Sequence, residues 1–283
     1  MLFLRLFGLL LATIFVNAQT FTDCNPLEKE CPADPAFGSD HTWYLNSSLN
    51  ENIWEVTTGE LEYTDDGAEF SIKERLQSPT LQSKFYIFFG TVESHVKMAK
   101  GGGIVSSVVL QSDDLDEIDW EWVGYNTTGV QSNYYGKGND SSYDRGGYHY
   151  VPNADTEFHN YTTYWTQEKV EWWIDGDLVR TLNYEDALDG KNFPQTPSNV
   201  RFGIWPAGDK KNPQGTIDWA GGTVDYDAGP YTMVVQKCRV HDFTSGKEYE
   251  YTDNSGDWES INVVKYVFTH LCNMISMLTN HQG

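Results

Sequence analysis

The sequence predicts an all-β sandwich, and two observations support this fold class. Short runs rich in β-branched and aromatic residues are separated by turns that contain glycine, while no long segment shows helical periodicity. The chain of 283 residues is 39% hydrophobic and 14% aromatic, which is enough apolar material for the core of one all-β domain or of two small ones.

The expected strands follow one another with short turns between them. The segment 170–182 contains two apolar runs around Asp175 and Gly176, a pattern that indicates a β-hairpin. A short helical turn is expected at 183–188. The ranges that read as strands are 85–99, 103–112, 170–182, 199–207 and 231–243.

The balance of charge limits the partners of the chain. It contains 41 Asp and Glu against 19 Lys and Arg, a formal net charge of -22. A nucleic-acid partner would need a basic face to neutralise its phosphates, so we expect no nucleic-acid binding. Neutral and cationic partners remain open.

The first eighteen residues have the pattern of a signal peptide. One Arg near the start precedes an apolar run from Leu6 to Val16, and the stretch ends in Asn17 and Ala18. A membrane anchor is the alternative, but the apolar run is short for a bilayer span. No other segment is apolar enough to span, so we expect a secreted protein with no transmembrane segment.

Secretion changes the interpretation of the cysteines and of the glycosylation motifs. Cys24 and Cys31 enclose a loop rich in turn residues, and a local disulfide is expected in an oxidising compartment. Cys238 and Cys272 either pair with each other or remain a buried strand thiol and a free thiol. The expected N-glycosylation sites are Asn46, Asn126, Asn139 and Asn160.

Residues 113–124, DDLDEIDWEWVG, contain six acidic side chains, and the last three of these alternate with large apolar side chains. Successive strand residues point to opposite faces, so one face of this strand is acidic and the other faces the core. The acidic face carries Glu117, Asp119 and Glu121. The apolar face carries Ile118, Trp120 and Trp122.

This spacing suits acid–base chemistry on a curved sheet. The Cα atoms of Glu117 and Glu121 would lie about 13 Å apart at ~3.3 Å per residue. Inward-leaning side chains on a concave sheet can approach the separation of about 5–5.5 Å that retaining glycosidases use. Crowding of like charges then raises at least one pKa and leaves another group ionised. An exposed acidic edge and a calcium site are the alternatives, and spacing alone does not separate them.

The surrounding sequence resembles a known family. DEIDWEWVG (116–124) resembles the catalytic Glu-x-Asp-x-Glu strand of glycoside hydrolase family 16 and, more narrowly, that of the fungal Crh family of cell-wall chitin–glucan transglycosylases. The resemblance covers about residues 20–261. Further stretches that resemble the Crh family are 24–38, 158–180, 201–222 and 229–243.

This resemblance implies a β-jelly-roll sandwich, concanavalin A-like, with a concave sugar-binding cleft. By position, Glu117 matches the nucleophile, Asp119 the helper that orients it, and Glu121 the general acid/base of a retaining mechanism. The chemistry needs no metal, and no cofactor is expected.

The acceptor decides the reaction that the resemblance implies. If a glycan hydroxyl resolves the covalent intermediate, the enzyme transfers chitin to β-1,3/β-1,6-glucan in the fungal cell wall. If water resolves it, the enzyme is an endo-hydrolase, either a chitinase or a β-glucanase. A catalytically silent glycan-binding lectin and a structural wall glycoprotein are further alternatives, and the three carboxylates argue against both.

Candidate substrate contacts lie in the segment 201–222. Trp205 and Trp219 are expected to be aromatic platforms for sugars, although a core position is the alternative for each. Arg201 and Thr216 are expected to be polar contacts, unless they are an ion-pair residue and an ordinary strand residue. The complete predicted substrate-binding set is Glu121, Arg201, Trp205, Thr216 and Trp219. Tyr134 and Tyr135 are further candidates, whereas His159 and Trp165 are expected to be structural.

The resulting organisation has three parts: a signal peptide at 1–18, a family 16 catalytic domain at 19–261, and an atypical tail at 262–283. Members of the Crh family usually carry a glycolipid anchor, but its signal is not evident in the tail. We expect a monomeric, extracellular, cell-wall protein whose partners are chitin and β-glucan.

We predict that Glu117→Gln abolishes turnover and preserves both the fold and sugar binding, because it removes the attacking charge with little change of shape. Product analysis, circular dichroism and calorimetric titration with chitin oligosaccharides measure the three properties. Normal turnover by this variant would rule out Glu117 as the nucleophile.

Overall fold

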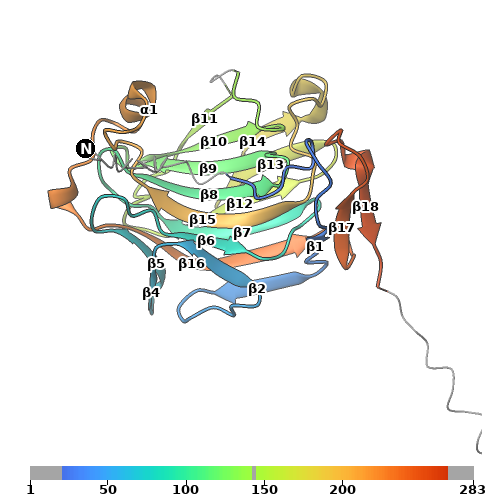
Figure 1. The fold of residues 1–283 in the computed structure, drawn as a ribbon. Helices are drawn as coiled ribbons and strands as arrows, with labels where there is room; N and C mark the ends of the chain where they lie inside the picture. The colour runs from blue at the N-terminus through green and yellow to red at the C-terminus, as the bar shows by residue number, and fades with distance from the viewer. Residues whose placement is uncertain (1–20, 142–144, 267–283) are drawn as a thin grey trace, which may run out of the picture.

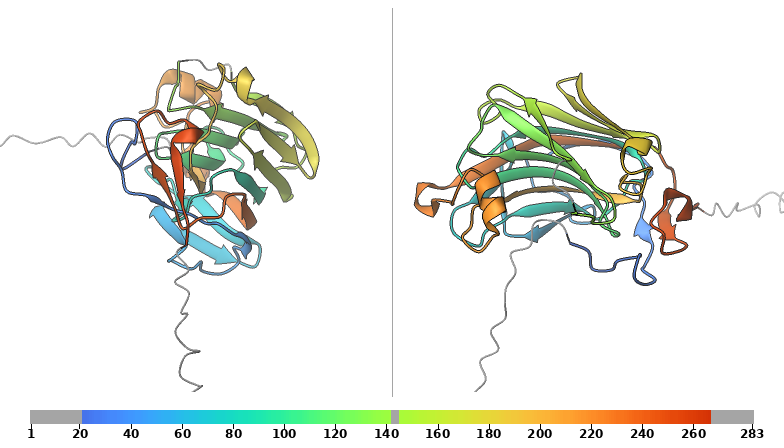
Figure 2. Two further views of the ribbon diagram at one scale, coloured as in Figure 1. Left: turned by 90° about the vertical axis from the view of Figure 1, so that its right-hand side faces the viewer. Right: turned by 90° about the horizontal axis from the view of Figure 1, so that it is seen from above.

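The computed structural model of the protein describes residues 21–141 and 145–266. Two large antiparallel sheets lie on each other as curved layers (Figure 1, Figure 2). A small sheet of three strands, in the order β1-β17-β18, lies at one end of the sandwich (Figure 1). This arrangement confirms the predicted all-β sandwich.

The first sheet, which we call the cleft sheet, has the strand order β11-β10-β9-β8-β15-β6-β3. Its strands are β3 (Trp54–Thr58), β6 (Thr80–Ser83), β8 (Val105–Ser112), β9 (Glu117–Val123), β10 (Gly129–Tyr135), β11 (Gly147–Tyr150) and β15 (Ser198–Trp205).

The second sheet, which we call the outer sheet, has the order β14-β13-β12-β7-β16-β5-β4, and β2 also pairs with β16. Its strands are β2 (Asp40–Tyr44), β4 (Leu61–Thr64), β5 (Gly67–Ile72), β7 (Gly90–Lys97), β12 (His159–Trp165), β13 (Lys169–Ile174), β14 (Asp177–Asn183) and β16 (Tyr231–Asp242).

The remaining elements are short. The small end sheet consists of β1 (Asp34–Pro35), β17 (Glu248–Tyr251) and β18 (Ile261–Val264), and the helical segments are η1 (Tyr184–Asp186), α1 (Gln214–Trp219), η2 (Tyr226–Ala228) and η3 (Trp258–Ser260). Because α1 has only six residues, none of the helices in the described ranges could cross a bilayer.

Aromatic side chains from both large sheets form the core between them. Trp120 and Trp122 of β9 are 1% and 0% exposed, and both pack edge-on against Tyr161 of β12, with ring centroids 5.5 and 4.6 Å away. From the neighbouring strand of the same sheet, the indole nitrogen of Trp172 in β13 donates a hydrogen bond of 3.1 Å to the backbone oxygen of Asp119. The outer sheet therefore holds β9 both by packing and by a hydrogen bond.

Most of the expected elements are present. The hairpin around Asp175 and Gly176 joins β13 to β14, and η1 falls within the expected helical turn at 183–188. The expected strand 85–99 begins only at Gly90. Phe88 and Phe89 are consecutive yet both 6% exposed, and Phe89 has a φ of 63°, so these residues cannot follow the alternation of a strand.

The predicted disulfide between Cys24 and Cys31 is confirmed, with the two Cα atoms 5.9 Å apart. Cys238 lies on β16 as a fully buried free thiol, and burial raises the pKa of this thiol. Its proposed partner Cys272 lies outside the described residues, as do the predicted signal peptide and most of the predicted tail.

We predict that Trp172→Phe lowers the free energy of unfolding by about 1–3 kcal/mol, because it removes a buried hydrogen bond and part of a packed side chain. Urea denaturation measures the change. The matched control is Trp258→Phe, at a half-buried position in η3. An equal or smaller loss for Trp172→Phe would contradict the anchoring role of this indole.

Candidate active site

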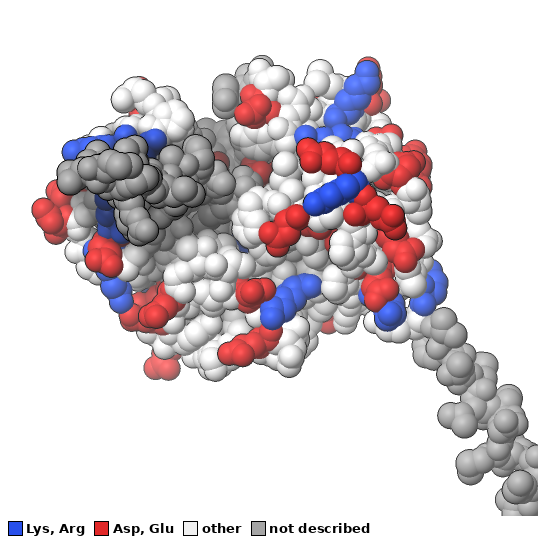
Figure 3. Space-filling model, in the orientation of Figure 1, with Lys and Arg blue, Asp and Glu red and all other residues white. Residues whose placement is uncertain are grey.

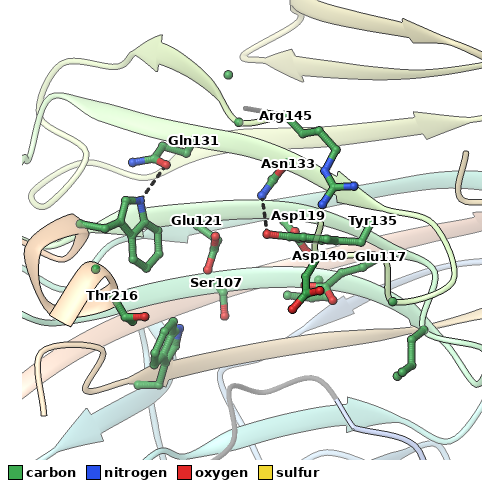
Figure 4. Close-up of a pocket in the computed structure, with 18 of the residues that line it drawn as sticks. Ser107, Glu117, Asp119, Glu121, Gln131, Asn133, Tyr135, Asp140, Arg145 and Thr216 are labelled. Carbon is green, nitrogen blue, oxygen red and sulfur yellow. Dashed lines mark hydrogen bonds between the residues drawn. The ribbon is translucent and has the colours of Figure 1, made fainter. Parts of the chain in front are cut away.

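A cleft of about 1110 Å³ opens over β8, β9 and β10 of the cleft sheet (Figure 4). Strands β8 and β10 flank β9 in the sheet, so the floor is built from three neighbouring strands. Residues that line the cleft include Ser107, Val109, Glu117, Asp119, Glu121, Gln131, Asn133, Tyr135, Asp140, Arg145, Tyr148, Trp205, Thr216 and Trp219.

The three carboxylates of β9 lie together on this floor. Figure 4 shows Glu117 and Glu121 on either side of Asp119 along the strand. Asp119 is 1% exposed, whereas Glu117 and Glu121 are half-buried. Strand β9 lies inside the sheet, so an acidic sheet edge is excluded. The described residues also contain no group of three or more acidic, His or Cys side chains placed to hold a metal ion.

The strand register gives each carboxylate its own neighbours. Glu121 lies between Ser107 of β8 and Gln131 of β10. One pair further along the strand, Asp119 lies between Val109 and Asn133. Apart from Val109, the neighbours of these two carboxylates are polar, which suits a ligand with many hydroxyl groups.

Burial raises the pKa of all three carboxyl groups, and the charges of neighbouring carboxylates raise those of Asp119 and Glu121 further. Burial raises the pKa of Glu121 to about 8, with a further contribution from the charge of Glu117. Burial also raises the pKa of Glu117, to about 7, but a hydrogen bond from Asp119 and the positive charge of Arg201 oppose this rise. Glu117 therefore ionises before Glu121.

The surroundings of Asp119 favour its protonated form. Burial raises its pKa well above the usual value, and the charges of Glu117 and Glu121 raise it further. A protonated Asp119 donates a hydrogen bond to the Glu117 carboxylate, which stabilises the ionised form of Glu117. The row thus combines one anion with two proton donors.

Two tryptophans stand beside the carboxylates. Trp205 at the end of β15 and Trp219 at the end of α1 lie with ring centroids 6.1 Å apart, and both line the cleft. The indole nitrogen of Trp219 donates a hydrogen bond of 3.0 Å to Gln131, which fixes the ring (Figure 4). Thr216 of α1 also lines the cleft, so with Glu121 the structure brings four of the five predicted contacts together.

Arg201 lies beside the cleft and not in its lining. Its side chain is 3% exposed and donates hydrogen bonds to Asn199 (2.8 Å) and to the backbone oxygen of Phe21 (3.3 Å). The ring of Phe21 covers its guanidinium at 4.8 Å. Arg201 therefore reaches the site through its charge, which favours the ionised form of Glu117.

Of the other aromatic residues considered as sugar contacts or structural residues, some lie in the cleft and some in the core. Tyr135 lines the cleft, whereas its neighbour Tyr134 is 7% exposed and packs into the core, as strand alternation requires. Trp165 is fully buried in the core. His159 is held by Asp175 and by the backbone oxygen of Pro152, in agreement with its expected structural role.

Two charged residues of the cleft were missed from the sequence, Asp140 and Arg145. Arg145 is 8% exposed, lies 4.5 Å from the ring centre of Tyr135, and donates a hydrogen bond to the backbone oxygen of Asn139. Both belong to the connection between β10 and β11, where no periodicity indicates direction. Ser107 could have been found, because it lies on the expected strand 103–112 in register with Glu121.

Comparison with known proteins identifies the family. Residues 49–221 match the model of glycosyl hydrolases family 16. "Crh-like protein 3" of Aspergillus fumigatus is 67% identical over 263 residues, which cover 92% of this chain and 72% of that protein. "Crh-like protein 2" of Botryotinia fuckeliana is 57% identical over 260 residues, which cover 91% of this chain and 58% of that protein.

Solved structures agree with this result. A structure described as "Crh5 transglycosylase in complex with NAG" has 50% identity and a TM-score of 0.83, and the match covers 85% of this chain and 99% of that one. A β-glucanase of Bacillus licheniformis shares the fold, with 23% identity, a TM-score of 0.60, and coverage of 72% and 98%.

The fold and the acidic strand thus define a protein of glycosyl hydrolases family 16. Within that family, the chain belongs to the fungal Crh-like proteins.

We predict that Glu117→Gln lowers the pKa of Glu121, because the charge of Glu117 is one of the causes of its elevation. The value remains above that of an ordinary glutamate, since burial is the larger cause. Carbon-13 NMR titration of the carboxyl groups measures the shift. Glu93→Gln on the outer sheet is the control and leaves Glu121 unchanged. An unchanged or higher pKa in Glu117→Gln would contradict the coupling.

Proposed function

We propose that the chain is a secreted transglycosylase that cleaves chitin with retention and transfers it to β-1,3- or β-1,6-glucan in the fungal cell wall. The observation that carries this proposal is the row of three carboxylates on the cleft floor, in a chain that is 67% identical to a Crh-like protein. The description of the solved Crh5 structure, a transglycosylase with NAG, supports chitin as the donor.

Glu121 and Glu117 divide the first chemical step between them. The carboxylic acid of Glu121 donates its proton to the glycosidic oxygen as the bond from that oxygen to the anomeric carbon breaks. The carboxylate of Glu117 attacks the anomeric carbon and forms a glycosyl ester. The order of their pKa values favours these roles, because Glu117 is ionised at a pH where Glu121 still holds its proton.

The second step returns both groups to their initial states. The Glu121 carboxylate takes a proton from the acceptor hydroxyl, whose oxygen displaces Glu117 from the anomeric carbon. Asp119 is the helper in both steps, because its proton stabilises the Glu117 carboxylate before attack and again as it leaves. Retention at the anomeric carbon follows from the two displacements.

The cleft residues supply the binding sites. Trp205 and Trp219 offer aromatic faces to sugar rings, and Thr216 offers a hydroxyl beside them. Arg201 is buried beside the cleft and acts through its charge on Glu117 rather than through contact with a sugar. Sugars that fill the acceptor side of the cleft exclude water, which favours transfer over hydrolysis.

The wider context of the proposal follows from the sequence. Residues 1–18 direct secretion, residues 19–261 form the catalytic domain, and residues 262–283 form the tail. The disulfide between Cys24 and Cys31 fits an oxidising compartment. On the face that Figure 3 shows, Lys and Arg are scattered among Asp and Glu, which suits a neutral polysaccharide better than a polyanion.

We predict that the purified protein forms hybrid products when it is mixed with chitin oligosaccharides and a fluorescent β-1,3-glucan oligosaccharide. Mass analysis of the labelled products is the measurement, and Glu117→Gln is the inactive control. Shortened chitin without hybrids would instead identify an endo-hydrolase. Retained chitin binding without any product would identify a lectin.

A further inference from the structure

A second hollow of about 360 Å³ lies on the outer sheet, on the face opposite the core. Strands β7, β12 and β13 form its floor. On β12, Tyr161 points into the core, so Asn160 and Thr162 point outward into the hollow. We call this feature the outer groove. The yellow strands in the left panel of Figure 2 lie along this side of the molecule.

A fixed tryptophan forms one wall of the outer groove. Trp173 of β13 lies directly across from Thr162 in the strand register. Its indole nitrogen donates a hydrogen bond of 3.2 Å to Glu171, which is itself 8% exposed and paired with Lys169. The hydrogen bond fixes the orientation of the Trp173 ring, whose aromatic face lies beside the small side chain of Thr162. This arrangement suits the apolar face of a sugar ring.

The charges around the groove are already neutralised. Glu171 pairs with Lys169 on one side, and Glu93 pairs with Arg239 on the other at 2.7 Å. A charged ligand would have to compete with these ion pairs. A neutral ligand with hydroxyl groups would not, so the groove fits an uncharged carbohydrate.

The chain places a glycosylation motif in this groove. Asn160, Tyr161 and Thr162 form an Asn-x-Thr motif, and Asn160 lines the hollow. The hydroxyl of Thr162 donates to Asn160 Oδ1 at 3.4 Å, so Thr162 engages the amide oxygen and leaves the amide nitrogen, the atom that carries a glycan, unused by this contact. Outward positions along a strand repeat about every 6.7 Å, so Thr162 and the indole across from it lie within reach of the first sugars on Asn160.

The other three motifs have different surroundings. Asn46 lies in an exposed bend. The amide nitrogen of Asn126 donates to Tyr148 at 3.1 Å, and that of Asn139 donates to Asn192 at 2.9 Å. Only Asn160, among these four described motifs, lies in a hollow of the outer sheet beside an aromatic wall.

We infer that Asn160 carries an N-glycan whose first sugars lie in the outer groove against Trp173. The glycan is then part of the folded surface of the outer sheet, whereas a glycan on Asn46 extends into solvent. This inference rests on the secretion that we propose above and does not depend on the proposed chemistry in the cleft.

The test compares two glycans on one molecule. The full chain is secreted from a yeast host, and peptide N-glycosidase is added without denaturant. Mass spectrometry of the Asn160 and Asn46 glycopeptides gives the rate of release at each site. Packing comparable to that of an aromatic pair makes release from Asn160 about tenfold slower than from Asn46.

Variants locate the cause of this protection. Trp173→Leu raises the rate at Asn160 to that at Asn46, and Trp173→Phe gives an intermediate rate, while circular dichroism confirms that both variants are folded. Tyr44→Ala is the control, because Tyr44 is 65% exposed on the same sheet but outside the groove. It leaves the rate at Asn160 unchanged.

An unoccupied Asn160 in the secreted protein would overturn the inference. Release at the same rate as from Asn46, or protection that survives Trp173→Leu, would overturn it as well. Asn160→Gln separates this inference from the proposed function, because it lies on the sheet face opposite the cleft and leaves the formation of hybrid products unchanged.

Discussion

The packing of the apolar face of β9 is the constraint on which the site depends. Ile118, Trp120 and Trp122 are almost completely buried between the sheets, and this burial fixes the register of the strand. A slip of one residue would turn these side chains toward the cleft and the carboxylates into the core. The energy that orders the acidic row therefore comes from the opposite face of the same strand, through burial of large aromatic groups.

The same packing explains the electrostatics of the cleft. Three carboxyl groups on alternate residues of a central strand cannot move apart, because the backbone holds their spacing. Their repulsion and burial keep Asp119 protonated and separate the pKa values of Glu117 and Glu121. In the mechanism that we propose, a rigid sandwich thus gives two glutamates of the same strand the different roles of nucleophile and acid.

The sequence predicts what depends on strand alternation and misses what depends on loops. The period of two in 116–124 was sufficient to place the acidic row, and the Gly-containing turns were sufficient for the all-β class. The sequence pattern does not predict where side chains lie when they depend on loops or on distant segments. The loop that carries Arg145 has no periodicity. The contact of Phe21 with Arg201 joins residues 180 positions apart. Such contacts follow from tertiary packing, which a local pattern does not contain.

The covalent intermediate offers the most direct test of this account. Glu121→Gln is incubated with an aryl glycoside of a chitin oligosaccharide, whose good leaving group needs no proton, and the protein is digested for mass spectrometry. The account predicts a glycosyl ester on Glu117, because β9 presents this carboxylate as the ionised member of the row. A label on another residue, or release of the aryl group without any labelled peptide, would contradict it.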